Sequence, residues 1–87
     1  MNSQVDVLPG ATRVKPKPPF RLEIELRSGG NILLNLGKLI QQRDAYWRLR
    51  QPRYFSMVSE DPWGGICWPE GEDLSRGGLY RYMVSKA

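Results

Sequence analysis

The chain has 87 residues, enough for one domain with one modest hydrophobic core. Its hydrophobic fraction of 40% and charged fraction of 25% are typical of a folded globular protein, which excludes a disordered tail. Thirteen Lys and Arg against nine Asp and Glu give a net charge of +4, a moderate field that would attract an acidic partner or nucleic acid. A single Cys67 and the lack of any His exclude an internal disulfide and zinc sites of the usual Cys and His type.

No apolar run approaches the roughly 20 residues needed to span a bilayer, and Met1 to Pro9 lacks a basic start followed by an apolar stretch. We therefore expect a cytoplasmic protein that neither enters a membrane nor carries a secretion signal. Residues 1–87 are expected to form a single domain with a Pro-rich, partly irregular start over residues 1–19. Proline removes a ladder donor, so strand pairing there should be brief, over Ala11 to Lys15 on a sheet edge.

Apolar and charged side chains alternate from residue 20 to residue 27, which predicts a half-buried antiparallel strand. Residues 28–31 tolerate positive φ angles, and a second apolar run follows at once, so the two runs predict a β-hairpin. The expected inner face carries Phe20, Leu22, Ile24 and Leu26 from the first strand, with Ile32, Leu34 and Leu36 from the second.

Helical spacing replaces this alternation after Gly37. It predicts a short helix near Lys38 to Gln42, a helical turn reaching Arg50, and another turn from Pro52 toward Phe55. Two further strands, joined through the turn-rich stretch SEDPWGG, are expected around Met57, Val58, Ile66 and Trp68.

The last segment, GGICWPEGEDLSRGGLY, is interpreted as a structural stretch of turns and of strand and helix ends, not as a catalytic loop or a metal site. Trp68 is expected to fill the core, Pro69 to end the ladder, and Asp73 or Ser75 to cap a helix. Since Gly77 and Gly78 each cost a helix up to about 1 kcal/mol relative to alanine, this helix is expected to begin after them. Its expected inner stripe is Leu74, Leu79, Tyr82 and Met83.

Together these segments predict a small α+β domain. We expect a curled antiparallel sheet of about four or five strands with short helices packed on one face.

The order of the segments resembles the bacterial domain-of-unknown-function family 2442. The resemblance covers about residues 5 to 82 and rests on RLEIELRSGG, LNLGKLI, LRQPRYF and GGICWPEGEDLSRGGLY. It departs from the family at Gly29-Gly30-Asn31 and at Gly77-Gly78. The resemblance implies an α+β domain without established catalytic residues, found alone, beside toxin-antitoxin-like partners, or joined to a helix-turn-helix module. The matching positions are Trp68, Pro69, Gly71, Asp73, Leu74, Leu79 and Tyr80.

The chain offers no convincing catalytic group, and we expect no enzyme activity. Cys67 has no His to activate it and is expected to be a small apolar filler on a strand. Glu23 and Glu25 are expected to form solvated cross-strand ion pairs rather than an acid and base pair.

Metals and cofactors are not expected either. Glu70, Glu72 and Asp73 form an acidic cluster, but it is too short and too irregular for the alternating oxygen ligands of a calcium loop. A turn followed by a helix cap explains the cluster.

The strongest candidate surface is the segment RDAYWRLRQPRYF, in which arginines alternate with aromatic residues. Both residue types are enriched at hot spots of protein interfaces. We therefore predict a non-catalytic binding module for a small protein partner in a toxin-antitoxin-like or regulatory pair. The predicted partner-binding residues are Tyr46, Trp47, Arg48, Arg50, Arg53 and Tyr54.

Two other interpretations stay open. The same mixture suits RNA or single-stranded DNA, so a nucleic-acid-binding accessory protein is the alternative, although no recognised nucleic-acid-binding motif is present. In the second, Trp47 and Phe55 belong to the core and the arginines are simply solvated.

The chain is expected to be a monomer, or a homodimer paired through an edge strand in its Pro-rich start.

Overall fold

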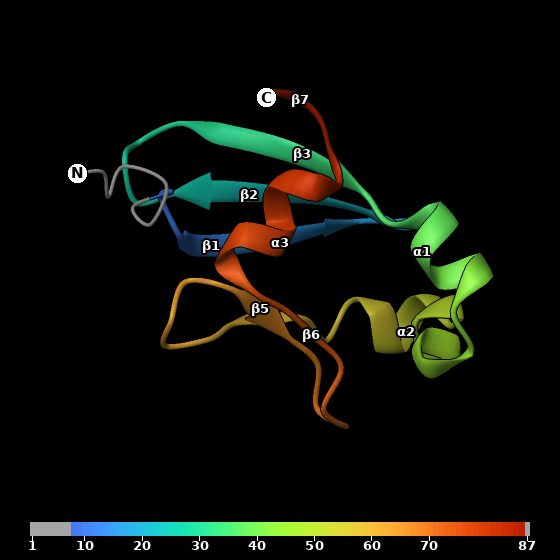
Figure 1. Cartoon of the computed structure of the whole chain (residues 1–87). Helices are drawn as coiled ribbons and strands as arrows, with labels where there is room; N and C mark the ends of the chain where they lie inside the picture. Colours follow the sequence, from blue (N-terminus) through green and yellow to red (C-terminus); the bar gives the residue numbers. More distant parts are fainter. Residues whose placement is uncertain (1–7, 87) are drawn as a thin grey trace.

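The computed structural model of the chain describes residues 8–86 (Figure 1). It confirms the expected α+β class, with a four-stranded antiparallel sheet in the order β1-β2-β3-β7. A second, three-stranded sheet in the order β4-β5-β6 lies below it in Figure 1. Residues 1–7 of the expected irregular start lie outside the described residues.

The strands of the larger sheet are β1 (Ala11–Lys17), β2 (Arg21–Leu26), β3 (Asn31–Asn35) and β7 (Met83–Lys86). Those of the smaller sheet are β4 (Ser59–Glu60), β5 (Ile66–Cys67) and β6 (Asp73–Leu74). The helices are α1 (Gly37–Gln42), the 3-10 helix η2 (Asp44–Arg50), α2 (Pro52–Phe55) and α3 (Arg76–Arg81).

The predicted hairpin is the centre of the structure. In β2 and β3, Leu22 pairs with Leu34 and Ile24 with Ile32, and all four side chains are buried. The turn between the strands requires a positive φ at Gly29, which is 99°, and glycine adopts such an angle without strain. The alternation therefore places the apolar side of this sheet against the rest of the domain.

Strand β1 runs two residues further than expected. It reaches Lys17, and Pro16 lies opposite Leu22, which is possible because β1 is an edge strand. The edge that could have paired with a second copy is partly covered, since the Val14 amide donates to the Glu60 carboxylate at 2.7 Å.

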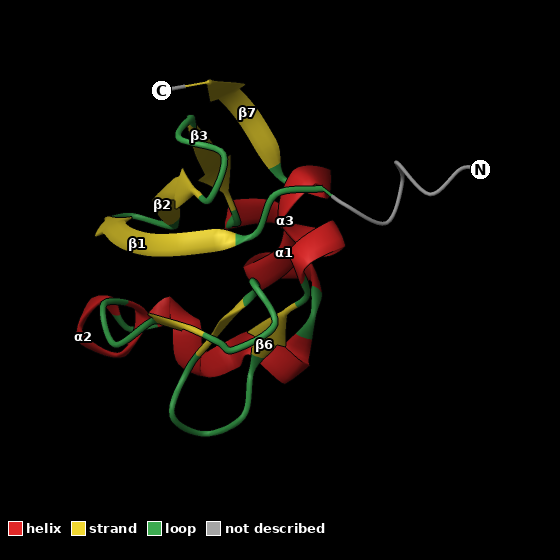
Figure 2. Ribbon diagram, turned by 90° about the vertical axis from the view of Figure 1, so that its left-hand side faces the viewer, coloured by secondary structure: helices red, strands yellow, loops and turns green. Residues whose placement is uncertain are grey.

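The helical predictions for the middle of the chain are confirmed within one residue, because α1 begins at Gly37 and α2 at Pro52. These helices cluster at one end of the domain, and α3 lies apart from them in Figure 1; the turned view in Figure 2 shows the larger sheet above the smaller one. None of the described helices has the length and apolar character needed to cross a bilayer.

Three local expectations were wrong. Met57 is exposed and precedes β4 instead of belonging to it. Helix α3 contains both Gly77 and Gly78, because the Ser75 hydroxyl caps it by accepting from the Gly78 amide at 3.1 Å. Of the expected inner stripe of that helix only Leu79 lies within α3: Leu74 belongs to β6, Tyr82 is the residue that follows the helix, and Met83 is exposed and begins β7.

One continuous core joins these elements. Apolar side chains from the larger sheet, the helices and the smaller sheet belong to the same buried cluster. Phe55 contacts Phe20 edge-on, with ring centroids 6.3 Å apart, and lies 6.1 Å from Trp68. Phe55 therefore belongs to the core, as one of the open interpretations supposed.

Candidate functional site

Trp47, on η2, is the most exposed aromatic residue of the predicted binding segment. It is 54% exposed, so the alternative interpretation that placed Trp47 in the core was wrong. The guanidinium carbon of Arg48 lies 4.8 Å from the centre of its ring, a cation-π contact. The structure thus presents an indole at the surface with a cation against one face.

An ion pair with a buried carboxylate holds Arg48 in place. Its Nη1 atom lies 3.2 Å from Oε2 of Glu72, whose side chain is only 5% exposed. The other carboxylate oxygen of Glu72 accepts a hydrogen bond of 2.6 Å from the Tyr54 hydroxyl. Arg48 and Tyr54 precede Glu72 in the chain by 24 and 18 positions, and both therefore contact one buried carboxylate.

Glu72 is ionised in the fold. Burial alone would raise the pKa of its carboxyl group, but hydrogen bonds from Tyr54, from its own backbone amide and from Arg48 outweigh burial and hold the pKa below its ordinary 4.5. The charge on Glu72 consequently fixes the Arg48 guanidinium at its place beside Trp47.

The two predicted tyrosines are tied to the same turn. The Tyr54 hydroxyl also accepts from the Glu70 amide at 2.8 Å, and the Tyr46 hydroxyl lies 3.4 Å from the Asp73 carbonyl oxygen. Burial raises the pKa of both hydroxyls above 10.0, and for Tyr54 the hydrogen bond to Glu72 adds to the rise. Both tyrosines thus join the middle of the chain to residues 70–73.

The two remaining predicted residues, Arg50 and Arg53, differ in their contacts. Arg50 donates to the Ile40 carbonyl oxygen at 3.2 Å and lies 3.8 Å from the Asp44 carboxylate, so it braces α1 against η2. Arg53 is exposed on α2. Of the six predicted partner-binding residues, three are therefore exposed (Trp47, Arg50 and Arg53) and three are half-buried (Tyr46, Arg48 and Tyr54).

The acidic cluster does not form a metal site. Among residues 8–86, no group of three or more His, Cys, Asp or Glu side chains is placed to hold an ion. Cys67 is half-buried, with its sulfur 3.7 Å from the Ser59 hydroxyl.

The paired glutamates of β2 form cross-strand ion pairs, as expected. Glu23 lies 3.6 Å from the Lys17 ammonium group, and Glu25 lies 4.0 Å from Arg13, both on β1.

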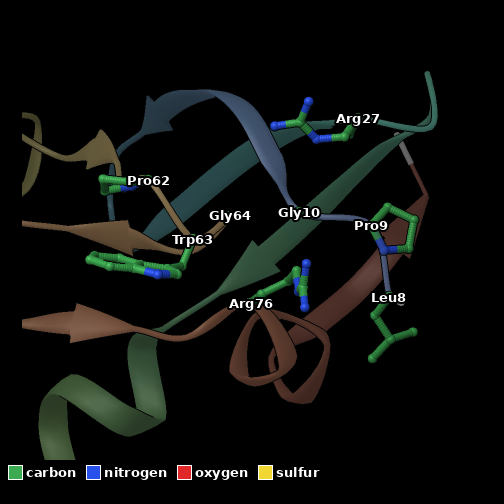
Figure 3. A pocket seen from close by; sticks show the side chains of 8 residues that line it. All are labelled: Leu8, Pro9, Gly10, Arg27, Pro62, Trp63, Gly64 and Arg76. Atoms are coloured by element: carbon green, nitrogen blue, oxygen red, sulfur yellow. The ribbon is translucent and has the colours of Figure 1, made fainter. Parts of the chain in front are cut away.

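A second surface was missed in the sequence. Trp63 lies in the loop between β4 and β5 with its side chain 80% exposed, and beside it is a hollow of about 470 Å³ (Figure 3). Its position inside DPWGG was the available signal, because an aromatic residue at the centre of a tight turn has little chance of burial. The hollow is lined by Leu8, Pro9, Gly10, Arg27, Pro62, Trp63, Gly64 and Arg76.

The residues that carry the family resemblance have structural roles. Trp68 and Leu79 are buried, and the Trp68 indole donates to the Phe55 carbonyl oxygen at 2.9 Å. Gly71 has a φ of 109°, which a side chain would resist. The Tyr80 hydroxyl donates to the Pro9 carbonyl oxygen at 2.7 Å, closing the start of the chain onto its end.

Among solved structures, the chain is similar to a protein from Nitrosomonas europaea named "Putative DNA Binding Protein", with a TM-score of 0.74 and 23% identity. The match covers 85% of this chain and 48% of that one, so this chain spans about half the length of its structural relative. No curated protein matches the chain. The sequence model described as "Protein of unknown function (DUF2442)" matches residues 11–85, and the chain therefore belongs to that family.

Proposed function

We propose that the chain is a non-catalytic binding module that recognises a small protein partner through the surface around Trp47. The observation that carries this proposal is the connected series from the buried Glu72 carboxylate through Arg48 to the exposed indole. The family resemblance supports a toxin-antitoxin-like or regulatory pair as its setting.

Rigidity is the physical reason why this surface suits a partner. An exposed side chain normally loses conformational entropy when a complex forms, and that loss weakens binding. The ion pair with Glu72 restrains Arg48, which in turn covers one face of the Trp47 ring. Tryptophan and arginine are also the residue types most often found at energetic hot spots.

Copurification of the tagged protein with the product of each neighbouring gene, washed at high salt, tests the proposal. We expect one specific protein to stay bound to the parent and to be lost from Trp47→Ala. Trp63→Ala is the matched control, because it removes an exposed indole from a different surface and should retain the partner. Binding that survives in Trp47→Ala, or no bound protein in any pairing, would contradict the proposal.

Light scattering on the purified chain distinguishes self-association from partner binding. If Trp47→Ala converts a dimer into a monomer, the surface binds a second copy of this chain and the proposed partner is wrong.

Nucleic-acid binding is a second candidate function. It is favoured by the name of the structural relative and by the net charge of +4. The surface on this chain that best suits such a ligand is the hollow beside Trp63, which is separate in sequence from the Trp47 surface.

A further inference from the structure

We propose that the hollow beside Trp63 holds one nucleotide unit of a single-stranded nucleic acid, with the base stacked on the indole and the phosphates beside Arg27 and Arg76. This inference rests on the second candidate function and gives it a place in the fold. Figure 3 shows the two arginines on opposite sides of the backbone at Gly10 and Gly64, with Trp63 on one flank and Pro9 on the other.

Four segments of the chain line the hollow, and backbone hydrogen bonds join three of them. The Ala11 amide donates to the Gly64 carbonyl oxygen at 2.8 Å, and the Arg27 amide donates to the Gly10 carbonyl oxygen at 2.9 Å. These bonds bring the start of β1, the end of β2 and the loop after β4 to one place. The hollow is therefore a product of the tertiary fold and not of a single loop.

Two glycines allow the backbone segments beside the hollow to approach each other closely. A Cβ atom added to Gly10 would lie 2.7 Å from the Gly64 Cα atom, so the two backbones cross in direct contact. The same atom would lie 3.2 Å from Cδ of Arg76, and one added to Gly64 would lie 3.1 Å from it. The aliphatic part of Arg76 thus rests on both glycines, which limits the positions open to its guanidinium.

The charge of the lining favours an anion. Arg27 and Arg76 both line the hollow, and none of the lining residues within 8–86 is acidic. The acid of the adjoining loop, Asp61, is turned into that loop, where one carboxylate oxygen accepts from the Trp63 amide at 2.8 Å and from the Gly65 amide at 2.9 Å. Asp61 therefore orders the loop that presents the indole.

The exposed indole selects among anionic ligands. An acidic peptide could pair with the arginines but would leave the Trp63 ring unused, whereas a nucleotide offers a phosphate and a flat base together. Base stacking on an aromatic side chain and phosphate contact with arginine are the shared features of single-strand binding. A volume of about 470 Å³ lies within the range of small-ligand sites.

Fluorescence anisotropy with labelled single-stranded DNA and RNA of about twelve nucleotides tests the site. We expect the parent to bind and Trp63→Ala to weaken binding roughly five- to a hundredfold, the range that the loss of one stacked base implies. Trp63→Phe should keep most of the affinity. Arg27→Ala should weaken binding and reduce the slope of log affinity against log salt by about 0.7, as the loss of one phosphate contact requires.

Met57→Ala and Lys38→Ala are the controls, because both residues are exposed and neither lines the hollow; these variants should bind like the parent, and circular dichroism checks that each variant is folded. Binding that is unchanged in both Trp63→Ala and Arg27→Ala would overturn the site while leaving the second function standing. No binding by the parent would overturn both. Capture of a polyglutamate peptide that depends on Arg27 and not on Trp63 would show that the hollow recognises acidic protein segments instead.

Discussion

The four-stranded sheet and the region from residue 44 to residue 74 share one apolar core, but the second region adds a buried polar network to it. The sheet buries an uninterrupted row of aliphatic side chains, among them Leu22, Ile24 and Leu34. The other region has short elements and depends on directional contacts, with Arg48 and Tyr54 both bound to Glu72. Apolar burial tolerates small shifts, whereas a buried carboxylate needs its donors in place. The second region is therefore the one whose geometry is tightly specified.

The largest expected effect comes from truncating the sheet. Ile24→Ala removes a fully buried side chain at the centre of β2 and should lower the free energy of unfolding by about 2–5 kcal/mol. Urea denaturation measures this loss, and Val84→Ala, at an exposed position, is the control. A loss in Ile24→Ala no greater than that in Val84→Ala would mean that the sheet is not the main apolar core.

Glu72→Gln tests the polar region and should cost about 1–3 kcal/mol at neutral pH. Because the folded-state pKa of Glu72 lies below 4.5, its contribution is fully present above that pH and is lost as the pH falls through the folded value. The difference in urea midpoint between parent and variant should therefore shrink in acid. Glu70→Gln, at an exposed position, should show neither effect; equal losses in the two variants would contradict the buried ion pair.

Tyr54→Phe should have the smallest effect, because Arg48 still pairs with Glu72 when the hydroxyl is gone. Burial, followed by the hydrogen bond to Glu72, raises the pKa of Tyr54 above 10.0, so its contribution is present below that pH and is lost as the pH rises through the folded value. The melting temperature of the parent should approach that of the variant in strongly alkaline buffer. A gap that stays constant there would contradict the raised pKa of the Tyr54 hydroxyl.

The contrast between the regions also explains what could be predicted. The hairpin was visible because a period of two over β2 and β3 encodes one buried face, and Pro52 marked the start of α2 because its fixed φ suits a first helical turn. These signals are local. The family resemblance was likewise carried by residues with fixed spacing, such as Gly71 and Tyr80.

The rest depends on contacts that no local pattern encodes. Glu72 looked like part of a solvated turn, because its donors lie 18 and 24 residues away. The sequence likewise left open whether Trp47 is a surface residue or part of the core; the structure leaves Trp47 54% exposed and buries Phe55 and Trp68. Ser75 was one of the two predicted caps of α3; what the local pattern did not show is that this cap starts the helix before Gly77 and Gly78.

The contact between Gly10 and Gly64 has a consequence for protein synthesis. Strands β1, β2 and β3 are translated first and can pair early, but Gly10 meets its partner only after 54 more residues have been added, and Pro9 waits for Tyr80. Contacts between such distant residues carry a large loop-closure cost and tend to form late. A nascent chain that stops before Tyr80 can display the hairpin but not the finished hollow, so ligand binding there would report that translation has passed the last helix.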